Sequence, residues 1–534
     1  MCQTPPILHS QSEKERKYDR QLRLWAASGQ EALESANILL LNSGPGAVGV
    51  ETLKNLVLPG IGRFTILDDS FVTDADLGVN FFLDDSCIGK SRAQCCTELL
   101  LELNPEVKGD WLPKAQESLK LEETLASSPT YTAILFTCPI RPENLAILRN
   151  YKEKHRTPLV GVHSAGFYSY FQVDLPGAFP IVDTHPDETA TTDLRLLSPW
   201  PELSEFAREL TKDIDSLDDH AHGHIPFVAI LLHYLEIWRK KHDGRNPSTY
   251  AEKIAFRKMV QEGARTDNPE GGEENFEEAA AAVVKTIVPS TLPAALKVVF
   301  DYRQAHPEDS KSGFWIITDA IKSFYERHSA LPLPGNVPDM KAQSSVYIKL
   351  QGIYKAKARR DFEEVLATVR SLPGGDSVDA AEVELYCKNA AFVKLINALD
   401  STRSGGGLGS ADRLRSVAAT EFANDEVAET MALPLSLLPI YLALQATSYE
   451  SGASSEAMLS NIGKLIPGAE KNKRVIEAAS EVARAHGSEL HNIAALTGGM
   501  VAQELIKIIT KQYIPIDNTC IFDGIGSRCQ VLRL

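Results

Sequence analysis

One glycine-rich turn constrains this chain more than any other feature. Residues 44–49 read GPGAVG and match the pattern GxGxxG. The apolar run Asn37 to Leu41 precedes the turn and predicts a buried parallel strand. Residues 47–58 follow it and predict a helix that ends before Pro59-Gly60. A strand, a tight turn and a helix in this order indicate a βαβ unit, in which main-chain amides of the helix N-terminus point at an anion.

Strand and helix patterns continue to alternate beyond this unit. Strands are predicted at Phe64 to Leu67, Tyr131 to Phe136, Pro158 to Val162 and Cys520 to Phe522, and helices at Ser91 to Leu103 and His491 to Lys511. Such alternation predicts an α/β fold with a doubly wound, mostly parallel sheet.

Helical patterns dominate between these two α/β segments. They run from Glu202 to Arg484 and include residues 226–241, 347–370 and 379–399. The sequence therefore predicts one α/β domain in two parts, residues 1–170 and 481–534, with a largely helical domain inserted at 171–480.

The glycine turn has more than one interpretation. If Gly44, Gly46 and Gly49 cradle a phosphate, Asp68 stands at the end of the next predicted strand, where a carboxylate accepts a ribose hydroxyl. That set is typical of an ATP site or of a nucleotide-dependent oxidoreductase. The same glycines would also appear if they only allowed the helix to pack closely on the strand.

Charge and hydropathy narrow the choice of partners. The 534 residues carry a net charge of −16, which argues against nucleic acid or an anionic membrane as the main partner. No apolar run approaches the ~20 residues that span a bilayer, and the N-terminus lacks the apolar stretch of a signal peptide. We therefore expect a cytoplasmic or nuclear protein.

Cysteines and histidines offer no metal site and no convincing nucleophile. The eight cysteines form no CxxC pair, and Cys95, Cys96 and Cys387 fall within predicted helices. His220, His222 and His224 alternate along the chain, but no fourth ligand is near in sequence, so we interpret them as a polar segment before a helix.

Several motifs resemble those of ubiquitin-activating-type enzymes. They are KYDRQLRLW at 17–25, LKNLVLPGIGRFTILDD at 53–69, NFFL and IGKSRA within 80–93, and TGGMVAQELIKIITKQ at 497–512. Within that family, DLRL at 193–196, EENFEEA at 273–279, VPDM at 337–340 and YIKLQ at 347–351 resemble the regulatory, amyloid-precursor-binding-type subunit of the heterodimeric neddylation-activating enzyme. The resemblance covers nearly the whole chain.

The resemblance implies a Rossmann-like adenylation-type domain and an inserted domain that is similar to a catalytic-cysteine domain without its cysteine. It also implies three partners: a catalytic activating subunit, a ubiquitin-like modifier and a downstream conjugating enzyme. In such a pair the catalytic subunit binds ATP and magnesium and forms the thioester. This chain would then have no cofactor of its own and be inert alone.

Family residues that handle ATP are replaced here. Carried over by position, the family's Asn falls on Asp76, its phosphate-binding Arg on Val79, its Lys on Arg92 and its Asp on or near Pro139. Val79 offers no charge to a phosphate and Pro139 no carboxylate to a metal, and both are needed to stabilise charge at the α-phosphate. The glycine loop would then bind a nucleotide only as a vestige.

Two segments are implied as partner contacts. In the family an Arg of the N-terminal motif reaches the partner's ATP phosphates, and that Arg corresponds to Arg20; otherwise Arg20 is a surface cation paired with Asp19 or a neighbour. Pro338, Asp339 and Met340 lie in a Pro- and Gly-rich segment that resembles a partner-binding loop, although an ordinary surface turn explains it equally well. Two other functions remain open, a nucleotide-dependent oxidoreductase and a non-enzymatic scaffold.

Overall fold

An eight-stranded sheet organises the first and last parts of the chain. The computed structural model describes residues 12–114, 120–127, 129–187, 193–266, 272–306, 312–396, 411–449 and 452–534. The chain forms two compact units. The first, here called the sheet unit, comprises Met1–Ile181 and Ile396–Leu534, and the second, the helical unit, comprises Val182–Leu395.

The sheet has the order β10-β9-β6-β5-β4-β1-β2-β3. Its strands are β1 (Asn37–Leu41), β2 (Arg63–Leu67), β3 (Lys108–Leu112), β4 (Ala133–Thr137), β5 (Leu159–Ala165), β6 (Tyr168–Asp174), β9 (Thr519–Asp523) and β10 (Arg528–Leu532). Strands β1 to β5 are parallel, and β6, β9 and β10 extend the sheet in antiparallel fashion. The predicted fold class, a doubly wound and mostly parallel sheet, is confirmed.

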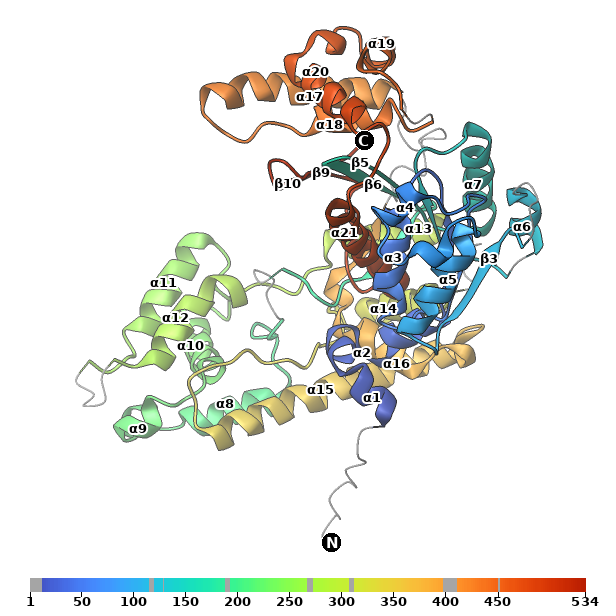
Figure 1. The fold of residues 1–534 in the computed structure, drawn as a ribbon. Helices are drawn as coiled ribbons and strands as arrows, with labels where there is room; N and C mark the ends of the chain where they lie inside the picture. Colours follow the sequence, from blue (N-terminus) through green and yellow to red (C-terminus); the bar gives the residue numbers. More distant parts are fainter. Residues whose placement is uncertain are drawn as a thin grey trace. The chain divides into compact units, whose positions relative to one another are not determined.

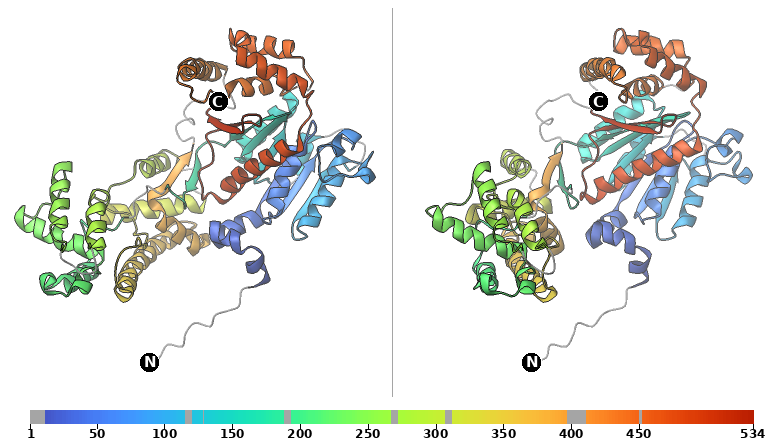
Figure 2. Two further views of the ribbon diagram at one scale, coloured as in Figure 1. Left: turned by 60° about the vertical axis from the view of Figure 1, so that its left-hand side comes forward. Right: turned by 90° about the vertical axis from the view of Figure 1, so that its left-hand side faces the viewer.

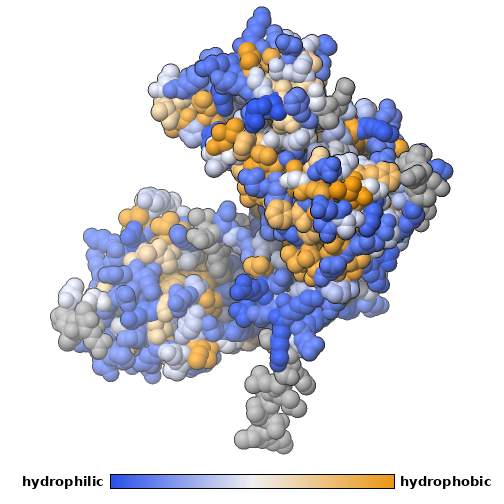
Figure 3. Space-filling view, in the orientation of Figure 1, coloured by the Kyte–Doolittle hydropathy of each residue, from blue (hydrophilic) through white to orange (hydrophobic). Residues whose placement is uncertain are grey.

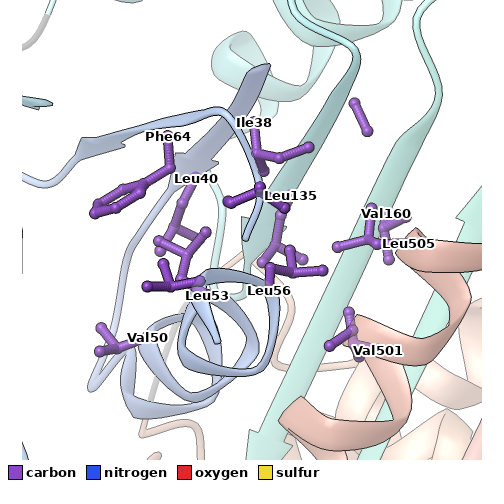
Figure 4. Packing of buried hydrophobic residues seen from close by; sticks show 14 of the residues in the cluster. Ile38, Leu40, Val50, Leu53, Leu56, Phe64, Leu135, Val160, Val501 and Leu505 are labelled. Atoms are coloured by element: carbon purple, nitrogen blue, oxygen red, sulfur yellow. The ribbon is translucent and has the colours of Figure 1, made fainter. Parts of the chain in front are cut away.

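Alternate residues of each strand serve the two faces of this sheet. Ile38 and Leu40 of β1 pack toward α3 (Ala47–Val57) and α21 (His491–Thr510), as Figure 4 shows for the labelled side chains around Leu53 and Leu505. Leu39 of β1 faces the opposite core with α6 (Leu121–Ser127) and α7 (Pro142–His155). Both faces of the sheet are therefore buried under helices, as expected for strands that are apolar along their whole length.

The other helices of the sheet unit before the insertion are short or lie at its edges. They are α1 (Glu13–Lys17), α2 (Asp19–Ser35), α4 (Asp74–Leu77), η1 (Asp85–Cys87) and α5 (Arg92–Leu103). Helix α21 is apolar and long enough to cross a membrane, but two-thirds of it (67%) is buried in the structure. It packs beside α3 (Figure 1), which accounts for its apolar character.

A helical group after the insertion belongs to the sheet unit. It consists of α17 (Ala411–Thr430), α18 (Leu438–Gln445), α19 (Ser455–Leu465), η6 (Ala469–Lys471) and α20 (Lys473–Arg484). Helix α18 is buried from Leu438 to Leu444 and shares a core with Tyr170 of β6 and Ile521 of β9. The sequence placed residues 396–480 in the insertion, but the apolar surface of α18 packs on these strands. Figure 2 shows the group beside the antiparallel strands in both views.

The helical unit is built around two apolar cores. Its helices are α8 (Pro201–Thr211), η2 (Ile214–Ser216), α9 (Asp219–His222), α10 (Phe227–Lys241), α11 (Tyr250–Gln261), α12 (Glu274–Thr286), α13 (Ala294–Ala305), α14 (Gly313–His328), α15 (Ser344–Ser371), η4 (Gly375–Ser377), α16 (Ala380–Lys388) and η5 (Ala390–Phe392). The helix predicted at 379–399 is wrong beyond Lys388. There the chain turns at Asn389, and β8 (Val393–Ile396) pairs with β7 (Phe179–Val182).

Candidate functional site

The glycine loop lies between the carboxyl ends of β1 and β4, where a doubly wound sheet reverses its strand order. Gly44 and Gly46 have φ angles of +63° and +65°, which side-chain-bearing residues rarely adopt. At Gly49 a Cβ atom would stand 2.7 Å from Oδ1 of Asn42 and 2.9 Å from Cγ2 of Thr137. The backbone and close packing thus require all three glycines.

Asp68 is held by an arginine of the same chain. Nε of Arg92 donates to Oδ2 of Asp68 at 2.7 Å, and Nη2 donates to Oδ1 at 3.1 Å. Nη1 of Arg92 donates to Oδ1 of Asp76 at 2.9 Å and to the carbonyl oxygen of Pro45 at 3.1 Å. Asp68 and Arg92 are both almost completely buried, so the guanidinium of Arg92 binds groups inside the protein and does not face solvent.

Charge and burial act together in this cluster. Burial alone would lower the pKa of Arg92, but the carboxylates of Asp68 and Asp76 raise it above its ordinary value. For Asp76, burial opposes ionisation, yet hydrogen bonds from Thr73 and Arg92 lower its pKa. The side chains of Arg92, Asp68 and Asp76 therefore form one buried network of ion pairs and hydrogen bonds.

The network changes what the loop can do. The structure brings Gly44, Gly46, Gly49 and Asp68 together, as the sequence implied, but Asp68 already accepts a bidentate pair from Arg92. The same carboxylate also accepts from Nδ2 of Asn42 at 2.9 Å and from the N–H of Ser70 at 3.0 Å, so its four acceptor positions are used and none is left for a ribose hydroxyl. The oxidoreductase alternative loses its main support.

A buried glutamate that the sequence analysis missed reaches the same loop. Oε2 of Glu489 accepts a hydrogen bond from the main-chain N–H of Val48 at 3.0 Å, and Ala47 also donates to this carboxyl group. Burial raises the pKa of Glu489 to about 7, against the effect of these two donors. Since Glu489 and Val48 lie 441 positions apart, no local sequence signal could have joined them.

The carboxyl end of β4 is covered as well. The chain continues there through Pro139 to Ile140, whose N–H donates to the carbonyl oxygen of Ser448 at 2.8 Å. Pro139 stands where the resemblance implies a metal-binding Asp, and its Cδ lies 2.9 Å from the position of a Cβ on Gly44. Val79 packs at the edge of the apolar core. No group that the structure describes at these two positions could hold a metal or a phosphate.

Arg20 lies apart from this loop on α2 and is exposed. Its neighbour Asp19 pairs with Arg23 at 2.9 Å, so the expected pairing of Arg20 with Asp19 is not what the structure has. Among the residues that the structure describes, Arg20 has no ion-pair partner. The start of the helix is anchored by Tyr18, which is buried and accepts a hydrogen bond from Asn104 at 3.1 Å.

Seven of the eight cysteines fall within the described residues. All but Cys529 are buried. Burial raises the pKa of Cys95 to about 11 and that of Cys96, Cys138, Cys387 and Cys520 to about 12. The pKa of Cys529 is also raised by burial. A nucleophilic cysteine needs the opposite shift, toward a lower pKa, and an accessible position.

In the helical unit, Pro338 and Asp339 are exposed, whereas Met340 is 8% exposed and packs in the core. The surface available to a partner in this segment therefore narrows to Pro338 and Asp339. His222 of the histidine segment turns inward, where Nδ1 lies 2.7 Å from Oε1 of Glu273. Among the described residues, no group of three or more His, Cys, Asp or Glu side chains could hold a metal ion.

Known proteins match this chain over nearly its full length. A model of the ThiF family matches residues 18–534. A NEDD8-activating enzyme E1 regulatory subunit from Xenopus laevis is 35% identical, with 96% of this chain and 97% of that protein aligned. The Gallus gallus regulatory subunit is 35% identical over 98% and 99%, and the AXR1 regulatory subunit of Arabidopsis thaliana is 33% identical over 98% and 97%.

Proposed function

Because this chain belongs to the ThiF family, and within it to the NEDD8-activating enzyme E1 regulatory subunits, we propose that it is the non-catalytic half of a heterodimer that activates a ubiquitin-like modifier of the NEDD8 type. The catalytic partner binds ATP and magnesium. The C-terminal carboxylate of the modifier attacks the α-phosphate of ATP, which gives an acyl adenylate and releases pyrophosphate. A cysteine thiolate of the partner then takes the acyl group and releases AMP.

One observation carries this division of labour. Within this chain, Arg92 donates to the carbonyl oxygen of Pro45 in the glycine loop, and Glu489 accepts from the N–H of Val48. Val79 and Pro139 supply no side-chain group that could bind a phosphate or a metal. Adenylation needs positive charge at the α-phosphate. The site that performs it therefore belongs to the other subunit.

Arg20 is the contribution of this chain to that site. It is exposed and, within the described residues, unpaired, so its guanidinium is free to fork onto phosphate oxygens of a partner. An arginine is always charged and suits a phosphate that gains charge in the transition state. Arg20 acts in trans because the loop of its own chain is already occupied.

Exposed apolar side chains favour a protein partner for the sheet unit. Phe81 is 79% exposed with its ring 3.9 Å from that of His491, and Ile525 is 61% exposed; Leu496 and Val531 are also exposed. Figure 3 shows apolar surface on the visible face of this unit. A stable heterodimer of such halves commonly buries more than ~2,000 Å². The exposed Pro338 and Asp339 supply a further contact to the partner, and the assembled surface receives the modifier and the conjugating enzyme.

The test is reconstitution. We expect the purified chain alone to give no ATP–pyrophosphate exchange, and the chain with the catalytic subunit of its own source to exchange and to run as one complex in light scattering. A chain that exchanges alone would assign the active site to this subunit. A well-behaved monomer that ignores the catalytic subunit would indicate a scaffold instead.

A further inference from the structure

Helix α3 begins without a side-chain cap of its own. Gly46 occupies the N-cap position, so the N–H groups of the first turn have no local acceptor. Free amides combine with the helix dipole to make such a turn attractive to an anion. In this chain the amides of Ala47 and Val48 instead donate to the carboxyl group of Glu489.

The backbone fixes Glu489 in this position. It follows α20 and immediately precedes Leu490, the N-cap of α21, and it forms a β-bridge with Gly166. The N–H of Gly166 also donates to the carbonyl oxygen of Ser488 at 2.9 Å. With an exposed fraction of 2%, Glu489 lies entirely inside the protein.

A second buried group faces the same turn. Asn42 is 4% exposed, and its Nδ2 donates to Oδ2 of Asp68 at 2.9 Å. Its Oδ1 has no hydrogen-bond partner in the described structure and lies against Gly46 and Gly49. A buried acceptor of this kind favours a ligand that also carries a hydroxyl donor, as hydrogen phosphate does.

We infer that the first turn of α3 is an anion site whose resident ligand is the carboxyl group of Glu489, and that hydrogen phosphate takes this place when the side chain is removed. The loop keeps the geometry of a phosphate cradle but is closed by its own chain. The tethered ligand ties the segment between α20 and α21 to the N-terminus of α3. A side chain that merely fills space or caps the helix would not be replaceable by a free anion.

Phosphate dependence of thermal stability tests this directly in the full-length chain. Glu489→Ala should gain at least about 2 °C of Tm in tens of millimolar sodium phosphate over sodium chloride at matched ionic strength. Wild type and Glu489→Gln, which keep the position filled, should show no such gain. Glu477→Ala, which removes an exposed glutamate of α20, is the matched control. A phosphate gain in Glu489→Ala no larger than in Glu477→Ala would overturn the inference.

Amide hydrogen exchange covers the case in which Glu489→Ala does not fold. In wild type the amide of Val48 should be protected, and Glu489→Asp, whose carboxylate is withdrawn by one methylene group, should lose part of that protection. A wild-type Val48 amide that exchanges like a solvent-exposed one, or a Val48 amide as protected in Glu489→Asp as in wild type, would contradict the proposal. The proposed function is independent of this result, because pyrophosphate exchange by the heterodimer reports on the partner's site.

Discussion

At the scale of single residues, Arg92 shows how one side chain changes the meaning of a motif. Arg92 keeps the positive charge that the resemblance implies at this position. Its guanidinium, however, donates its hydrogen bonds to Asp68, Asp76 and the carbonyl oxygen of Pro45. The place of Arg92 in the sequence motif predicted a positive charge there. Only the structure shows that the charge is directed inward, because hydrogen-bond direction depends on residues from three separate segments.

Removing Asp68 should therefore affect stability and spare catalysis. Asp68→Ala leaves a buried guanidinium without its main partner, which typically costs 3–5 kcal/mol of unfolding free energy. Urea denaturation measures this cost, with Asp110→Ala, at an exposed pair with Lys114, as a control of small effect. Folded Asp68→Ala heterodimer should exchange pyrophosphate at the wild-type rate, and loss of exchange would mean that this chain carries the ATP site.

Arg20→Ala should do the reverse. Losing one electrostatic contact at a transition state costs ~2–4 kcal/mol of barrier, on the order of a hundredfold in rate. Folding should be unchanged because Arg20 is exposed. Arg20→Lys should recover part of the rate, since it keeps the charge and loses the fork. The measurement is pyrophosphate exchange by the heterodimer, with the exposed Arg23→Ala as neighbour control; equal rates for the Arg20 and Arg23 variants would refute the role in trans.

The raised pKa of Glu489 predicts a pH effect on stability. Its carboxyl group binds a proton more tightly folded, at a pKa of about 7, than at the ordinary value of 4.5. The stabilisation that protonation gives is therefore complete below about pH 4.5 and is lost as pH rises through about 7, by up to about 3 kcal/mol. Glu489→Gln cannot ionise, so its stability relative to wild type should improve between these pH values. Parallel curves of unfolding free energy against pH for the two proteins would show that the pKa is not raised.

At the scale of elements, the helices and strands that have a local sequence signal could be predicted, whereas the surfaces on which they pack could not. Strand β1 and helix α3 were predicted closely because continuous apolar runs and a glycine turn are local signals. Strands β6 and β10 were not found. Residues 411–480 were assigned to the insertion because helical periodicity shows that a helix has an apolar face but not which surface that face covers. Figure 2 and the core shared by α18, β6 and β9 supply that information.

Within the segment 331–340, substitution of Met340 should affect stability, and substitution of Asp339 should affect binding of the partner. Met340→Ala should lower the unfolding free energy by 2–5 kcal/mol, roughly, because it opens space in the core of the helical unit. Asp339→Ala should leave stability unchanged and weaken binding of the catalytic subunit. Titration calorimetry of the two subunits checks this, with the exposed Asn336→Ala as control. Unchanged affinity for Asp339→Ala would make the segment an ordinary surface turn.

At the scale of the whole molecule, the proposed function divides one reaction between two chains. The match of residues 18–534 shows membership of the ThiF family, and relatives aligned over 96% and 98% of the chain show membership of the regulatory subunits. The sequence motifs predicted this membership because their order and spacing extend over nearly the whole chain. The occupied loop and the exposed Arg20 fit a chain that completes a site elsewhere. Neither the loop's occupants nor the state of Arg20 could be derived from motifs, because both depend on which side chains meet in the folded protein.

Such a chain should never carry the modifier as a thioester. The six buried cysteines of the described structure are inaccessible, and desolvation raises the pKa of five of them, which leaves very little thiolate at neutral pH. Cys529 is exposed, but its pKa is raised as well, so it is a poor nucleophile. Incubation of the heterodimer with modifier and ATP, followed by a non-reducing gel, should show the thiol-sensitive adduct on the catalytic subunit only. The same gel with Cys529→Ser should be identical to wild type. An adduct on this chain that dithiothreitol removes and Cys529→Ser abolishes would make Cys529 an acceptor and this subunit a participant in the transfer itself.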